Sequence, residues 1–318
     1  LTGYYDNAAK HKTSSDQEKT LQDAVIKTIG SFANTLPVYQ RSEVMLFIMG
    51  KIPVPGIYPA LGSPNAGFEG SGMIQVMLLK SLLQVSERYE STNLLTALPS
   101  SFLEPLLSFT LMEEPEIRLL VLSILTSLID RHHNAARLSD VSVTFDVSDL
   151  ELKDDACCRQ DNLFIRKVGK ALSDPTLTSA PLELGLVSVQ HAQRLYRHVY
   201  LACREESSGR SHYRALVTLL AVLGVELANE EVLVDLIRLV LALQELALSN
   251  QEGLSTFNRC GLHAVCATFL HLLSQLGPPP ELQQHITQVI ALRQKDAPHL
   301  LPDHVFSEEP RYGEQVSG

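Results

Sequence analysis

PEIRLLVLSILTSLID, residues 115–130, is the stretch that decides the fold. Its apolar residues recur at intervals of three and four, which is the spacing of one face of an α-helix. They are Ile117, Val121, Ile124 and Leu128. Pro115 suits the first helical position, where its missing N–H costs nothing. We therefore predict a buried amphipathic helix over 115–130.

The same spacing recurs along most of the chain and predicts many further helices. In the N-terminal part they cover 16–33, 39–49, 73–87 and 101–112, and in the C-terminal part 192–205, 212–228, 230–249, 255–276 and 281–295. The expected apolar stripe of the first of these helices is Leu21, Val25, Ile29 and Phe32. Pro105 lies about one turn inside its helix, where we expect it to cause a kink.

The predicted helices are separated by clear breaks. Pro53–Gly72 collects four Pro and five Gly and is expected to be a loop. Val141–Leu152 alternates apolar and polar residues, which fits a short strand or an extended connector. The junction 227–231 is so short that the helices on either side are expected to pack antiparallel, as an αα-hairpin. Asn229 would cap the second of them.

Helices paired by short turns favour an all-α fold, an armadillo/HEAT-like α-solenoid of antiparallel helix hairpins. No fixed-period repeat is visible in the sequence, so a compact multi-helix bundle remains the alternative. We divide the chain into helical repeats over 1–140, a connector with an insertion over 141–191, and helical repeats with an extended C-terminal tail over 192–318.

Composition bounds the function. The chain is 45% hydrophobic and 19% charged, as is ordinary for a folded protein. Its formal charge of −10 argues against a nucleic-acid partner, which needs a basic surface. Five cysteines without a disulfide-scaffold spacing indicate a reducing compartment. The most apolar stretches, 119–129 and 215–225, are too short to cross a bilayer.

Three groups of residues resemble metal ligands. His132 and His133 are adjacent, so on a helix end their side chains point about 100° apart and are poor joint ligands. Cys157 and Cys158 have no second pair at zinc-finger spacing. A third group lies on one helical face and cannot surround a tetrahedral ion alone; it consists of Cys260, His263 and Cys266. We predict no catalytic, cofactor or metal residue and no small-molecule substrate, since the common nucleotide, hydrolase and zinc-protease motifs are missing.

One region carries more basic than acidic residues, although the chain as a whole is acidic. Between Arg159 and Arg214 there are nine Lys or Arg against five Asp or Glu. An ordinary solvated face is the simpler interpretation, and a surface facing anionic lipid or an acidic partner is the alternative.

Several stretches resemble the rolling-blackout family, also called the EFR-three homologs, and most closely its vertebrate form. The likeness covers most of the chain. The matching stretches are AVIKTIGSFA (24–33), YQRSEV (39–44), MLLKSLLQVS (77–86), EIRLL (116–120), IDRH (129–132), RLYRH (194–198), ELANEEV (226–232) and DLIRLV (235–240).

The resemblance implies a palmitoylated peripheral protein with a helical rod, on the cytoplasmic face of the plasma membrane and in the cytosol. There it would recruit phosphatidylinositol 4-kinase III alpha, together with a tetratricopeptide-repeat scaffold protein, for the synthesis of phosphatidylinositol 4-phosphate. The family's anchoring cysteines and its partner-binding tail are expected to lie outside these 318 residues, so neither role is assigned to a residue here.

Between Lys167 and His191 the family pattern is interrupted by Val168–Gln190, which is rich in Leu, Pro, Ser and Thr. We interpret this segment as a translated retained intron and expect a disordered loop. The leading functional prediction is a non-enzymatic scaffold that recruits the lipid kinase. The alternatives are a soluble helical-repeat adaptor in trafficking, unrelated to a lipid kinase, and an enzyme with an unrecognised all-α site.

Overall fold

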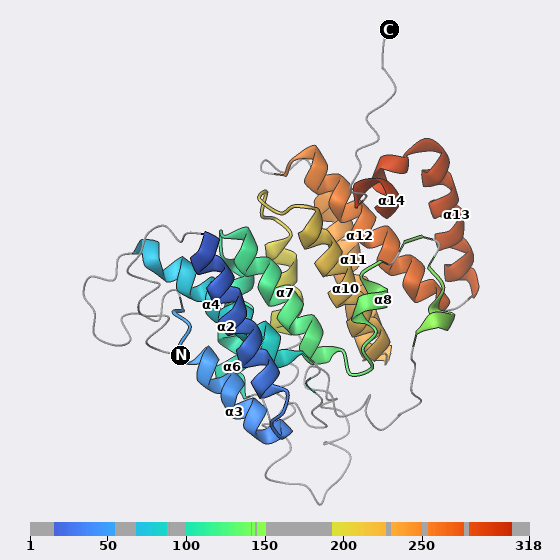
Figure 1. Ribbon diagram of the computed structural model, residues 1–318. Helices are drawn as coiled ribbons and strands as arrows, with labels where there is room; N and C mark the ends of the chain where they lie inside the picture. Colours follow the sequence, from blue (N-terminus) through green and yellow to red (C-terminus); the bar gives the residue numbers. More distant parts are fainter. Residues whose placement is uncertain are drawn as a thin grey trace, which may run out of the picture.

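The computed structural model describes residues 16–54, 68–87, 89, 99–140, 142–143, 145–150, 193–226, 230–249, 254–276 and 280–306. Within these ranges the regular structure is helical, and no strand forms. In Figure 1 the N-terminal helices α2, α3, α4 and α6 lie on the left, α7 and α10 in the middle, and α13 and α14 on the right. This arrangement confirms the predicted all-α solenoid.

The helices agree well with the sequence pattern. The long ones are α2 (Asp16–Ala33), α3 (Val38–Met49), α4 (Phe68–Ser86), α6 (Ser100–Ser108), α7 (Pro115–Ile129), α10 (Arg210–Glu226), α11 (Glu230–Leu248), α12 (Thr256–Gln275) and α13 (Pro280–Asp296). The short ones are α8 (Ala135–Leu138), α14 (Pro302–Val305) and the 3-10 turns η1 (Phe109–Leu111), η2 (Val147–Asp149) and η4 (Pro298–Leu300). A further helical segment covers 193–202.

Two layers make up the solenoid. In the first, α2, α4, α7, α10 and α12 succeed one another, each packed on the next. In the second, α3 packs on α4 and on α6, and α11 packs on α12. One hydrophobic core includes residues of the helices from α2 to α12 and also Val305 and Phe306 at α14. Helix α13 packs through a second, smaller cluster of Val143, Ala267, Ile286, Ile290 and Leu301. In such a row each repeat packs on its neighbours, so the packing fixes the distance between the two ends.

The helix that decides the fold lies in the middle of this row. Ile117, Val121 and Ile124 on α7 are completely buried between α4 and α10. Pro115 occupies the first turn, and Glu116 beside it faces the positive end of the helix dipole. Its carboxylate also lies 2.7 Å from the Lys80 ammonium of α4. The predicted helix over 115–130 is thus confirmed.

Two helix crossings require glycine. A Cβ on Gly261 of α12 would lie 2.5 Å from the ring of Tyr213 on α10. A Cβ on Gly30 of α2 would lie 2.7 Å from Cβ of Gln84 on α4. At both sites the neighbouring helix occupies the space of a side chain, so these glycines set how closely the layer packs.

The structure corrects the predicted N-terminal elements. Phe68–Gly72 belongs to α4 and not to the loop, since the packing of a long helix overrides the modest helix propensity of glycine. Leu21 and Phe32 of the expected stripe are 55% and 64% exposed. The buried face of α2 is rotated from the predicted one and carries Ile26 and Ala33.

Three further predictions change in detail. The single helix expected over 101–112 is divided in two. Its first part is α6, and its last turn tightens into the 3-10 turn η1, as is common at helix ends. Of Val141–Leu152, the described residues form η2 and no strand, which favours the connector. The helices α10 and α11 contact each other, but each packs more extensively on α12, because α12 lies against both of them. The short helix α8 was not predicted.

Some predictions lie outside the described residues. They include the cap at Asn229, most of the connector over 141–191 with the insertion Val168–Gln190, and the C-terminal tail beyond residue 306. These stay predictions.

Candidate functional site

A groove lies on one face of the first layer. Its volume is about 440 Å³. It is formed by α4, α7, α8 and α10. Its lining residues are Leu83, Glu87, Ser123, Thr126, Ser127, Asp130, His133, Ala135, Ser139, Asp140, Arg214, Ala215 and Thr218.

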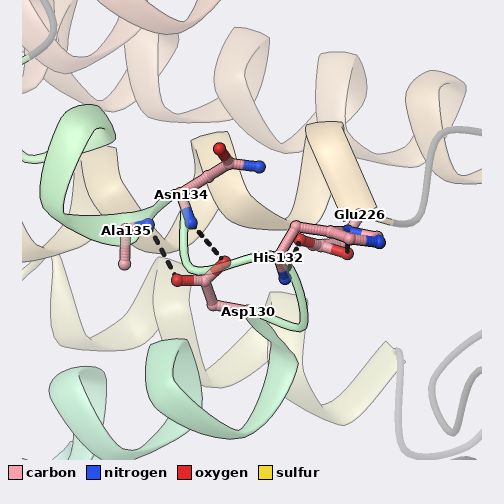
Figure 2. A network of polar contacts seen from close by, with 5 residues as sticks. All are labelled: Asp130, His132, Asn134, Ala135 and Glu226. Atoms are coloured by element: carbon pink, nitrogen blue, oxygen red, sulfur yellow. Dashed lines mark hydrogen bonds and ion pairs between the residues drawn. The ribbon is translucent and has the colours of Figure 1, made fainter. Parts of the chain in front are cut away.

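A polar corner closes one end of the groove, where α7 ends and α8 begins (Figure 2). The carboxylate of Asp130 accepts hydrogen bonds from the backbone N–H groups of Asn134 and Ala135, at 2.9 and 2.8 Å. It thereby caps the first turn of α8, which has no partners for these donors within the helix. His133, in the same turn, has φ of 56°, a left-handed conformation that the corner requires.

His132 joins this corner to the end of α10 (Figure 2). Its Nδ1 lies 2.8 Å from one carboxylate oxygen of Glu226, and its backbone N–H donates to the other at 3.1 Å. The side chain of Glu226 is only 1% exposed. Burial raises the pKa of Glu226, and the neighbouring His132 opposes that shift. The pair fastens α7 to α10.

Several polar side chains of the groove are engaged in structural contacts. The Ser123, Thr126 and Thr218 hydroxyls each donate to a backbone carbonyl of their own helix. Asp140 lies 3.8 Å from Arg214 at the groove's exposed rim. Asp130, the carboxylate deepest in the corner, is engaged by two N–H groups and serves the turn. These polar side chains stabilise the wall of the groove, and none of them forms a nucleophile–base pair.

A second polar network is buried deeper, around Arg118 of α7. This side chain is 1% exposed. Its Nη1 donates to the carbonyls of Met112 and Glu113, both at 2.8 Å, and its Nη2 donates to the hydroxyls of Ser207 and Ser208 at 2.9 and 3.4 Å. Burial lowers the pKa of Arg118, and neighbouring carboxylates oppose that shift. The guanidinium ties α7 to the loop that precedes α10.

The same loop is held from two other sides. His212 accepts from the Gly209 N–H through Nδ1 at 3.1 Å, and its Nε2 lies 2.7 Å from the Pro115 carbonyl. This geometry needs a neutral ring with the proton on Nε2. Burial accordingly lowers the pKa of His212. From α12, the side-chain amide of Asn258 donates to the carbonyl of Glu206 at 2.9 Å.

The metal-like residues do not form a metal site in the described structure. His132 binds Glu226, while His133 lines the groove. On α12, Cys266 is buried and its thiol lies 3.3 Å from the Val240 carbonyl, and burial raises its pKa to about 12. Nδ1 of His263 is buried and has no hydrogen-bond partner. No group of three metal ligands occurs among the described residues.

Other predicted features are placed only in part. Cys157 and Cys158 lie outside the described residues, as do four of the nine basic residues between Arg159 and Arg214. Of the five that are described, Arg194 pairs with Glu104 of α6, and Arg214 lies at the groove.

Sequence reasoning missed the two polar side chains that matter most to the packing, Arg118 and Glu226. A signal for Arg118 was present, because Leu122 and Leu125 follow it at helical spacing and mark its side of the helix as apolar. Glu226 ends a helix whose preceding residues, 219–225, are all apolar or glycine, and nothing in the sequence pairs it with His132.

No helix in the described part of the chain has both the length and the apolar character to span a bilayer. The family model "EFR3, armadillo repeat" matches residues 4–181 and 186–314. The four residues between the two matched parts fall inside Val168–Gln190, the proposed insertion, which stays a prediction.

Curated relatives align along nearly the whole chain. "Protein EFR3 homolog B" of Homo sapiens is 49% identical over 100% of the chain, and its counterpart from Danio rerio is 54% identical over 98%. "Protein EFR3 homolog A" of Homo sapiens is 44% identical over 92%. The chain spans about a third of the length of these relatives, namely 36%, 36% and 33%. No solved structure matches it.

Proposed function

The chain belongs to the EFR3 armadillo-repeat family, and on that premise we propose that it is the helical rod of a non-enzymatic scaffold for a lipid kinase. The scaffold recruits phosphatidylinositol 4-kinase III alpha, together with a tetratricopeptide-repeat scaffold protein, to the plasma membrane. It thereby supports the synthesis of phosphatidylinositol 4-phosphate there. The family match along both halves of the chain is the observation that carries this proposal.

The internal contacts favour a mechanical role. The most deeply buried charged groups, Arg118 and Glu226, link successive helices and are engaged by structural partners. Polar groups used in this way hold one register of packing, and a solenoid with fixed packing keeps its two ends at a fixed separation. Such a rod can hold a kinase at a set distance from a membrane without any chemistry of its own.

We propose that a lipid modification of the longer protein attaches the rod to the membrane. A formal charge of −10 makes electrostatic adsorption of this rod to an anionic leaflet unfavourable. The proposed location is therefore the cytoplasmic face of the plasma membrane, through the anchor, with a further cytosolic pool.

The test is affinity purification of the longer protein that contains this chain, from solubilised membranes, with quantification of the kinase in the eluate. We expect the kinase and the tetratricopeptide-repeat protein to co-purify. The variant Arg118→Met, which loosens the rod, should recover less kinase, and Arg197→Met, which removes an exposed arginine, should recover as much as the wild type.

Recovery of the protein from the soluble fraction, with no membrane pool and no kinase, would contradict this function. That outcome would favour the trafficking adaptor instead.

A further inference from the structure

Helix α11 buries one face and leaves an apolar stripe on the other. Its inner face carries residues that are fully or almost fully buried, namely Val232, Leu236, Val240, Leu243 and Ala247. On its outer face, Val234, Leu241 and Leu248 are 45%, 49% and 62% exposed. Scattered exposed apolar residues need no explanation, but these three lie in one line.

The three residues are spaced by seven. A heptad spacing keeps side chains along one seam of a helix when a second helix packs against it with a slight left-handed twist. From Val234 to Leu248 the stripe is about 21 Å long, at 1.5 Å per residue. The seam therefore has the length and the pattern to bind one more helix.

The charged residues beside the seam favour a second copy of α11 as that helix. Arg238 and Glu245 are both exposed on the same outer face, three residues before and four residues after Leu241. Suppose that a second α11 lies antiparallel, with the two-fold axis at Leu241. Arg238 of each copy then lies opposite Glu245 of the other, with an offset along the helix axis of only one residue, about 1.5 Å. Val234 then meets Leu248, and Leu241 meets its own copy.

Parallel pairing is unfavourable, because it sets Arg238 against Arg238 and Glu245 against Glu245. In the single chain Arg238 lies 3.2 Å from Asp235, but 74% of its side chain is exposed, so this surface pair holds the guanidinium only weakly. Arg238 is free to turn to a carboxylate of a second copy.

We propose that the outer face of α11 is a homodimer interface, in which two copies pair antiparallel through Val234, Leu241 and Leu248 (α11, Figure 1). One helix from each copy buries less area than the roughly 1,200–2,000 Å² of a standard interface, so the dimer is weak. We therefore expect a dissociation constant on the order of 10–100 µM, weaker than that of a standard-size interface. The dimer presents every partner surface twice and so raises avidity at a membrane.

The test is sedimentation velocity of the 318-residue chain over that range of concentrations. Leu241→Glu places two carboxylates face to face on the two-fold axis and should weaken dimerisation by at least about tenfold. The matched control is Leu292→Glu, which changes a leucine on α13 that is 61% exposed, compared with 49% for Leu241. It should leave the dimerisation constant within about twofold of the wild type.

A charge exchange tests the orientation. Arg238→Glu and Glu245→Arg should each weaken the dimer several-fold, and the double variant should restore it. All these side chains are exposed, so circular dichroism should show the same fold for each variant. A chain that stays monomeric throughout, equal effects of Leu241→Glu and Leu292→Glu, or a double variant weaker than either single one would each overturn the proposal.

Discussion

Arg118 provides the sharpest test of how the rod is held together. The substitution Arg118→Met keeps most of the side-chain volume but removes the donors that serve two carbonyls and two hydroxyls. The hydroxyls of Ser207 and Ser208 can turn to other partners, whereas the carbonyls of Met112 and Glu113 are fixed by the backbone. Loss of the guanidinium therefore leaves two carbonyls without these bonds.

A fully buried acceptor left without a partner costs about 1–3 kcal/mol, so the two carbonyls, whose bonds to Arg118 are partly buried, together cost at most about 2–6 kcal/mol. Part of this cost is offset, because the variant no longer buries a charged group. We expect Arg118→Met to lower the free energy of unfolding by about 2–4 kcal/mol. Arg118→Lys keeps the charge but loses the fork of donors. Its free energy of unfolding should lie between those of Arg118→Met and the wild type.

Urea unfolding, followed by circular dichroism, measures the change. Amide hydrogen exchange compares the variant with the wild type. The increase in exchange rate should be larger in the loop before α10 than in α2, because Arg118 holds that loop. Arg197→Met is the control, since Arg197 is exposed and its loss should cost no more than about 0.5 kcal/mol. If both variants lose the same stability, the buried network does not hold the repeats together.

Three other changes have definite signs. Gly261→Ala should cost about 1–3 kcal/mol in urea unfolding, because its Cβ would lie 2.5 Å from the Tyr213 ring. The control is Gly224→Ala, whose Cβ would meet its nearest neighbour at an ordinary 3.5 Å, and this change should be neutral or stabilising by up to about 1 kcal/mol. Equal losses of stability in the two variants would contradict the close helix crossing at Gly261. Burial lowers the pKa of His212 and of His271 below the ordinary 6.5, so the unfolded chain binds protons more tightly. Their stabilising contribution is complete above pH 6.5 and is lost as the pH falls below that value. In a pH series of unfolding curves, His212→Asn should flatten this loss, and an unchanged slope would refute the neutral ring.

Much of the fold could be predicted because helix periodicity is a local property. The helix over 115–130 was predicted within one residue of its end, from four apolar residues and one proline. The first predicted stripe failed at Leu21 and Phe32, because periodicity shows that a helix has an apolar side but not how far its neighbours reach around it. The buried side of α2 is set by the close approach of α4 at Gly30.

The polar links could not be predicted, because they join residues far apart in the sequence. His132 and Glu226 are 94 residues apart, and Arg118 is 89 residues from Ser207. A lone arginine within an apolar helix face is nevertheless a usable signal. Together with Leu122 and Leu125, it indicates a buried cation that must find acceptors on another segment.

The central claim is that this rod acts by holding a partner in place and not by chemistry. The most direct measurement uses cells that lack the protein, with the kinase fused to an artificial plasma-membrane anchor. A fluorescent sensor then reports phosphatidylinositol 4-phosphate at the plasma membrane. The scaffold account predicts that the anchored kinase restores the lipid without this protein. Restoration that still required the protein would contradict it.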